Sequence, residues 1–152
     1  MAKTYPTILV PVDFSEMSRA ALHHAVELLT PGGTLLVAHV VDDTPMTYGY
    51  VGLNPSVNEM RSQMAEAADA ELKGFVTQPS VEGEIKPYIL HGAPHREIVR
   101  LAEQKDVDLI VMSTHGRSGL PHALLGSVAE HVVQKAPCAV LVLREKKEKT
   151  GD

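Results

Sequence analysis

The sequence predicts an α/β protein, built as an open five-stranded parallel sheet with helices on both faces. Two observations carry this prediction. Five short apolar segments alternate with four segments of helical spacing, which gives the order β-α-β-α-β-α-β-α-β. Strict alternation is typical of parallel sheets joined by right-handed crossovers. The apolar segments are also apolar at consecutive positions, as expected for strands that helices cover on both sides.

The strands are expected where β-branched and apolar residues cluster, at residues 7–12, 34–41, 84–90, 109–112 and 139–143. The third of them is the weakest, because EIKPYIL is less apolar than the others. It also contains Pro87, which has no N–H to donate and therefore confines this strand to an edge of the sheet.

Helices are expected between the strands, at residues 16–29, 57–77, 94–104 and 127–135. Asp13 and Ser15 are both candidate N-caps for the first helix, and Glu16, three residues after Asp13, suits a capping box. Pro31-Gly32-Gly33 should end this helix. Pro94 is well suited to open the third helix.

The second helix carries a methionine stripe, which we interpret as core rather than as a groove for a partner. The residues at helical spacing are Met60, Met64, Ala67, Ala68, Leu72 and Phe75. The long connection before it, at residues 43–56, is either a flap or an ordinary loop.

Composition limits the function. The 152 residues suit one domain, which we place at residues 1–145, followed by a charged, flexible tail at residues 146–152. A formal net charge of −5 argues against a dedicated nucleic-acid binder. No apolar run approaches the roughly 18 residues of a membrane span. Cys138 is the only cysteine, which excludes a disulfide framework and a cysteine zinc site and fits a cytoplasmic protein.

The segment after the fourth strand is the richest in chemistry. Glycines at 116, 119 and 126 permit close approach of the backbone to a ligand, and Gly126-Ser127 opens a helix whose free N–H groups favour an anion. Nearby hydroxyls and Arg117 add donors and charge. This combination predicts a phosphate-binding loop from Gly116 to Ser127, with a plain connection as the alternative. It matches neither the Walker loop nor the dinucleotide fingerprint.

Over nearly its whole length, the chain resembles the universal stress protein family. The resemblance is carried by ILVPVDFS at residues 8–15, HVVD at 39–42, HGAP at 91–94, PCAVLV at 137–142, and Gly116 followed after nine residues by Gly126-Ser127. The nucleotide-binding branch of that family carries Gly-x-x-Gly, nine residues, Gly-Ser/Thr. This chain has Ser113 where the first glycine would stand.

The resemblance implies a Rossmann-like sheet with strand order 3-2-1-4-5 and an adenine nucleotide, ATP or AMP, with Mg²⁺ as a companion of ATP. It implies that the base lies near Pro11, Val12, Asp13 and Val40. Met112, Ser113 and Gly116 would flank the ribose and α-phosphate. The phosphates would be bound by Gly126, Ser127 and Val128, with Arg117 as a further candidate.

The same resemblance implies a homodimer that pairs through the last strand, Ala139, Val140, Leu141, Val142 and Leu143. This segment is short and apolar, and would be an exposed edge in a monomer. Pairing across a two-fold axis would remove that edge.

Three function classes remain open. The first is a nucleotide-binding stress regulator or sensor, the second a slow ATPase or nucleotide-transferring enzyme, and the third a dimeric interaction protein with an empty pocket. Fast phosphoryl transfer usually needs a metal clamp and a group that positions the nucleophile. The only carboxylates expected near the loop are Asp13 and Asp42, on other strands, which favours binding over turnover. The eight histidines predict neither a metal site nor a catalytic triad.

Overall fold

A computed structural model describes residues 2–43, 55–77, 79–114 and 125–145. Its centre is a five-stranded parallel sheet in the order β3-β2-β1-β4-β5. The strands are β1 (Tyr5–Pro11), β2 (Leu29–Val41), β3 (Gly83–His91), β4 (Leu109–Ser113) and β5 (Ala139–Leu143). The predicted fold class and strand order are confirmed.

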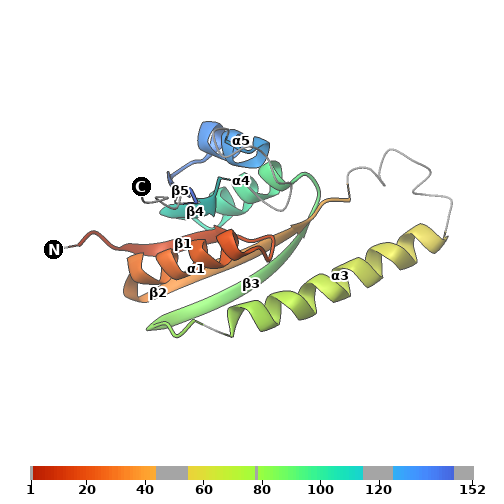
Figure 1. The fold of residues 1–152 in the computed structure, drawn as a ribbon, viewed down its shortest axis with the longest axis horizontal. Coiled ribbons are helices and arrows are strands. Elements are labelled where there is room, and N and C mark those ends of the chain that lie inside the picture. The colour runs from red at the N-terminus through yellow and green to blue at the C-terminus, as the bar shows by residue number, and fades with distance from the viewer. Residues whose placement is uncertain (1, 44–54, 78, 115–124, 146–152) are drawn as a thin grey trace, which may run out of the picture.

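In the described residues, four helices cover the two faces of the sheet (Figure 1). They are α1 (Glu16–Leu28), α3 (Pro55–Val76), α4 (Pro94–Gln104) and α5 (Ser127–Lys135). Helices α1 and α3 share a buried cluster with Ile8 and Val10 of β1, whereas α4 and α5 share another with Leu9. Because successive strand residues point to opposite faces, these three consecutive residues must all be apolar. All three are fully buried, which explains the unbroken apolar run in β1.

The strand β3 lies at one edge of the sheet and β5 at the other. The edge position of β3 confirms the prediction from Pro87, which pairs there with Val37 of β2. The central strand β1 has β2 on one side and β4 on the other. The chain therefore winds outward in both directions from β1, and a crevice is expected beyond the carboxyl end of this strand.

Two boundaries around α1 differ from the prediction. Ser15 is the N-cap, with its side chain accepting from the N–H of Ser18, so Glu16 opens the helix and the expected Asp13 capping box is wrong. At its other end α1 passes directly into β2, which begins at Leu29 rather than at residue 34. Gly32 has a φ of 80° there, and the β1–β2 register shifts between Tyr5 and Thr7. The glycine pair thus marks an irregular strand start.

The methionine stripe of α3 is exposed, which makes the prediction of a core position wrong. Met60 and Met64 are 51% and 40% exposed, whereas Ala68, Leu72 and Phe75 are buried. Figure 1 shows the reason: the C-terminal half of α3 runs along the sheet, and its N-terminal half extends beyond it. Of the predicted flap, residues 44–54 lie outside the described residues, and so does the tail at 146–152.

Candidate functional site

A cavity of about 250 Å³ opens at the carboxyl ends of β1, β2 and β4, where the N-termini of α4 and α5 also meet. This is the crevice beside β1 at which the winding of the sheet reverses, the usual ligand position in an open parallel sheet. Its lining residues are Pro11, Val12, Asp13, Ser18, Ala38, His39, Val40, Pro94, Ile98, Met112, Ser113, Thr114, Gly126, Ser127, Val128 and Ala129.

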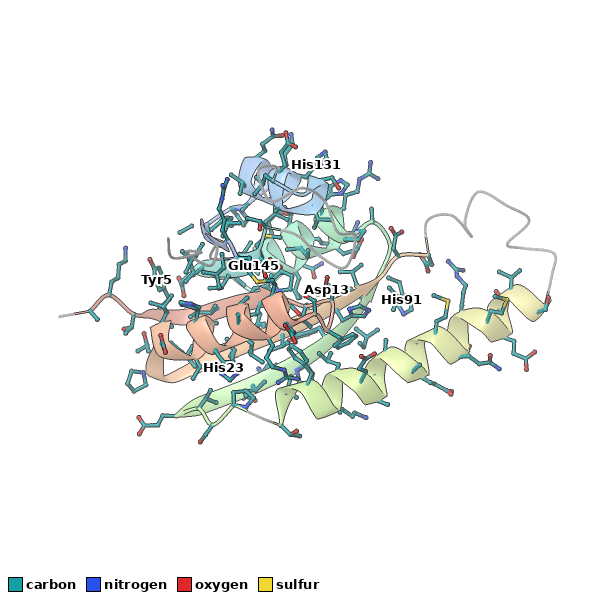
Figure 2. The ribbon with its side chains drawn as sticks, in the orientation of Figure 1. Tyr5, Asp13, His23, His91, His131 and Glu145 are labelled. Carbon is teal, nitrogen blue, oxygen red and sulfur yellow. The ribbon has the colours of Figure 1, made fainter. Side chains whose placement is uncertain are left out.

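The corner after β1 forms one wall of the cavity. The N–H of Val12 donates to the carbonyl of Ala38 at 2.8 Å, which ties the corner to β2. The Nδ1 of His39 lies 2.8 Å from the carbonyl oxygen of the same valine. A carboxylate oxygen of Asp13, which Figure 2 labels, accepts from the N–H of Ser15 at 3.0 Å. Hydrogen bonds of Val12 and Asp13 therefore hold the corner in place.

The opposite wall is the start of α5. Gly126 is its N-cap with an extended backbone, and no side chain caps the helix. The N–H of Glu130 already bonds to the carbonyl of Gly126, so the N–H groups of Ser127, Val128 and Ala129 are the ones without a partner inside the helix. These three residues line the cavity. The arrangement suits an anion, because N–H groups without a partner inside the helix lie at the cavity wall, at the positive end of the helix dipole.

The N–H of Gly126 has a backbone partner at the end of β4. Its N–H donates to the carbonyl of Thr114 at 2.8 Å, and the N–H of Thr114 donates to the carbonyl of Leu143 at 2.9 Å. The N–H of Gly126 is thus engaged within the protein, and the expected contact of this residue with a phosphate stays a prediction. The hydrogen bond between Gly126 and Thr114 holds the start of α5 against the end of β4. It thereby positions the N–H groups of the next three residues.

Helices α4 and α5 touch through two histidines beside the cavity. The rings of His95 and His131 stack with centroids 4.5 Å apart, and His131 donates from Nδ1 to the carbonyl of Ser127 at 2.6 Å. Partial burial lowers the pKa of His95, and the neighbouring His131 and Arg96 lower it further. His95 therefore favours its neutral form.

An ion pair with a buried carboxylate lies at the carboxyl ends of β2 and β3 but does not line the cavity. Asp43, 7% exposed, accepts from Arg61 of α3 at 2.8 Å, and Nδ1 of His91 lies 3.6 Å from the same carboxylate oxygen. His91 ends β3 (Figure 2). The three side chains join α3 to the ends of β2 and β3.

The structure brings the described residues of the predicted site together. Around the cavity lie Pro11, Val12, Asp13, Val40, Met112, Ser113, Gly126, Ser127 and Val128. Gly116 and Arg117 lie outside the described residues, so the structure says nothing of their positions.

Sequence reasoning missed several residues of the lining, namely Ser18, Ala38, His39, Pro94, Ile98 and Ala129. A signal existed for some of them. Ala38 and His39 directly precede Val40 near the end of a buried strand. Thr114, whose hydroxyl is one of those expected to add a donor beside the loop, also lines the cavity. Ile98 offers no such signal, because it looks like any apolar position of a helix.

The described residues contain neither a cluster of metal-binding side chains nor a membrane-spanning helix. No group of three or more histidine, cysteine, aspartate or glutamate side chains among them could hold a metal ion. None of the helices in the described part of the chain is both long enough and apolar enough to cross a membrane.

The comparisons with known proteins agree with one another. The model of the universal stress protein family matches residues 4–144. Universal stress protein MJ0577 of Methanocaldococcus jannaschii is 35% identical, covering 96% of this chain and 99% of its own length. Universal stress protein MJ0531 of the same organism is 37% identical, covering 95% and 85%.

Solved structures extend this likeness to the fold. The structure of MJ0577 has a TM-score of 0.84 at 33% identity, covering 95% of this chain and 99% of that one. Universal stress protein UspA from Lactobacillus plantarum has a TM-score of 0.73 at 33% identity, covering 94% and 100%. The family model spans nearly all of the sequence, and several full-length relatives exceed 30% identity. The chain therefore belongs to the universal stress protein family.

Proposed function

We propose that this protein binds an adenine nucleotide, ATP or AMP, in the cavity beside β1 and acts in a stress response as a regulator or sensor. One observation carries the proposal. The three N–H groups at the start of α5 that lack a partner inside the helix belong to residues that line the cavity. A phosphate is the anion for which such a helix start is best suited.

The other walls of the cavity suit the rest of a nucleotide. Pro11, Val12, Val40 and Met112 offer apolar surface to a flat base. Asp13 also lines the cavity and carries a carboxylate, a natural acceptor for ribose hydroxyls. A pocket of this kind, mostly apolar with a few polar groups, is typical of cofactor sites.

Ser113 is the residue on which the ribose and α-phosphate end of the proposal depends. It ends β4 and lines the cavity, at the position where the nucleotide-binding branch of the family has glycine. Serine is small, and its hydroxyl can donate to an oxygen of the ligand. We therefore propose that a nucleotide still binds with Ser113 in place of the glycine.

Two solved proteins of the same fold support the choice of ligand at the level of the fold. One universal stress protein structure is a complex with cAMP, and one from Archaeoglobus fulgidus is a complex with dAMP. Both are under 25% identical to this chain, so they indicate only that this fold can hold an adenine nucleotide.

Binding without rapid turnover is the version of this function that we favour. Asp13 is the only carboxylate among the described lining residues, and one of its oxygens already accepts from Ser15. Fast phosphoryl transfer generally uses carboxylates that hold a metal ion and a group that positions the nucleophile. A slow ATPase remains the second candidate, with Mg²⁺ bound to the phosphates of ATP rather than to a dedicated protein site.

The decisive experiment identifies the ligand first. Protein purified without added nucleotide is denatured, and the released small molecules are identified by mass spectrometry. Calorimetry then measures the affinities for ATP, AMP and adenosine. We expect ATP or AMP to bind, and the absence of binding at millimolar concentrations would contradict the proposal. ADP formation well above the spontaneous rate, abolished in Gly126→Val, would favour the ATPase instead.

We also propose that the protein is a homodimer through β5. This strand pairs with β4 on one side only; Ala139 is exposed, and Val140–Leu143 are partly exposed. A second copy would cover this apolar edge. Light scattering should give twice the chain mass of 16.4 kDa at micromolar concentration. A mass of one chain at every concentration would contradict this assembly.

A further inference from the structure

We infer that His39 is a positioning residue for the nucleotide cavity, which it serves by holding the carbonyl group of Val12. The inference rests on the proposed function, because it assigns a role in binding to a residue that the family resemblance did not place in the site. It is carried by the hydrogen bond between His39 and Val12, by the backbone conformation at Phe14 and by the ring contacts of Phe14.

The hydrogen bond has only one possible direction. The carbonyl oxygen of Val12 can only accept, so the Nδ1 of His39 carries the proton and donates to it across 2.8 Å. The N–H of Val12 in turn donates to the carbonyl of Ala38 at 2.8 Å. Adjacent residues of β2 thus hold both backbone groups of Val12, one through the main chain and one through a side chain.

The backbone after Val12 has an unfavourable conformation. Phe14 has a φ of 66°, in the left-handed region that residues other than glycine seldom adopt. Such a conformation persists only when its surroundings impose it. The ring centroid of Phe14 lies 4.5 Å from that of His39 and 5.7 Å from that of Phe75. His39 therefore restrains this corner both through the carbonyl and through the ring.

The restrained corner is part of the cavity wall. Pro11, Val12 and Asp13 line the cavity and lie immediately before Phe14. If the carbonyl of Val12 were released, the chain could rotate at this corner and carry the carboxylate of Asp13 out of position. A shift of this kind weakens binding through Asp13, separately from any contact that His39 makes with the ligand as a lining residue.

Two substitutions at His39 separate the hydrogen bond from the space that the ring fills. In His39→Asn, the amide nitrogen is attached to Cγ, as Nδ1 is in histidine, so the donor to Val12 is kept. His39→Leu fills a similar volume but has no donor. We expect the leucine variant to bind ATP or AMP about tenfold more weakly and the asparagine variant to stay within about threefold of the wild type.

Amide hydrogen exchange in the ligand-free protein is a second test of the role of His39, and it does not depend on a nucleotide. In His39→Leu, the amides of Phe14 and Ser15 should exchange faster than in the wild type, whereas His39→Asn should retain the wild-type rates. The melting temperature serves as a control, because the leucine side chain is apolar and preserves the packing. A loss of affinity without a loss of overall stability is the result that a purely structural role would not produce.

The possible outcomes are distinct. Equal loss of affinity in both variants, with unchanged exchange, would overturn the inference, because the ring would then act on the ligand directly. Wild-type exchange rates in His39→Leu would also overturn it. If the wild-type protein binds no nucleotide, the proposed function fails, and the exchange rates alone decide whether His39 holds the corner.

Discussion

Replacing Ser127 by aspartate should stabilise the protein and weaken nucleotide binding. Ser127 is the first residue of α5, its side chain is exposed, and no side chain caps this helix. A negative charge at this position interacts favourably with the helix dipole. The same charge would face the phosphates that we propose to lie at this helix start.

The two magnitudes follow from simple electrostatics. A carboxylate at a helix N-terminus contributes about 0.3–1 kcal/mol, which corresponds to a rise of about 1–4 °C in melting temperature for a domain of this size. At about 5 Å from a phosphate charge, with an effective dielectric constant of about 20 to 80, the repulsion is about 1–3 kcal/mol. Affinity for ATP or AMP should therefore fall by roughly 5-fold to 150-fold.

Calorimetry with three ligands tests this directly. The control Ser127→Asn introduces a side chain of nearly the same shape as aspartate but without its charge. It should bind ATP and AMP almost as tightly as the wild type does. Gln134→Glu adds the same charge to an exposed position near the other end of α5. It should leave the affinity unchanged. Adenosine has no phosphate, so its affinity should be the same in all four proteins.

Wild-type affinity of Ser127→Asp for ATP and AMP would refute the placement of the phosphates at α5. An equal loss for adenosine would refute it as well, because the substitution would then have damaged the cavity rather than repelled a phosphate. A lower melting temperature would show that the start of α5 is not the uncapped helix end inferred from Gly126.

Three further predictions concern stability and reactivity. Leu72→Ala should lower the free energy of unfolding by about 2–5 kcal/mol, because it opens a hole under α3, and denaturant titration would contradict this if the loss were below about 1 kcal/mol. Burial raises the pKa of the Cys138 thiol, so a thiol reagent near neutral pH should label it far more slowly than unfolded protein; equal rates would speak against this. The pKa of His95 is lowered by burial, His131 and Arg96, so the unfolded chain binds more protons and stability falls as pH drops through the ordinary histidine value of 6.5. His95→Gln should lose less stability than the wild type between about pH 7.5 and pH 5.5, and identical pH profiles in thermal unfolding would exclude this contribution.

The fold was largely readable from the sequence because periodicity and proline are local signals with few alternatives. The unbroken apolar run Ile8-Leu9-Val10 requires a strand covered on both faces, and Pro87 requires an edge. The alternation of strands and helices then leaves little choice of architecture. The family resemblance placed Asp13, Ser113 and Ser127 in one site, and in the structure all three line the same cavity.

The exposure of the α3 methionines and the start of α1 could not be predicted from local sequence patterns. Met60 and Met64 have helical spacing equal to that of Leu72, and only the length of α3 relative to the sheet leaves them exposed. The cap of α1 is Ser15 rather than Asp13, because the left-handed turn at Phe14 delays the start of the helix. A cytoplasmic location, the single domain at residues 1–145 and the role of Gly116 and Arg117 remain predictions.

By itself, the sequence determined that a helix begins at Gly126-Ser127, after the loop that follows a buried strand, because glycine, serine and apolar periodicity act within a few residues. Only the tertiary structure decided which of its N–H groups are available. The one at Gly126 is bound to Thr114, and those at Ser127 to Ala129 lack partners within the helix. Likewise, only the pairing of β1 with β2 brings His39 to the carbonyl of Val12. Hydrogen bonds between residues far apart in the chain depend on how the strands and helices pack.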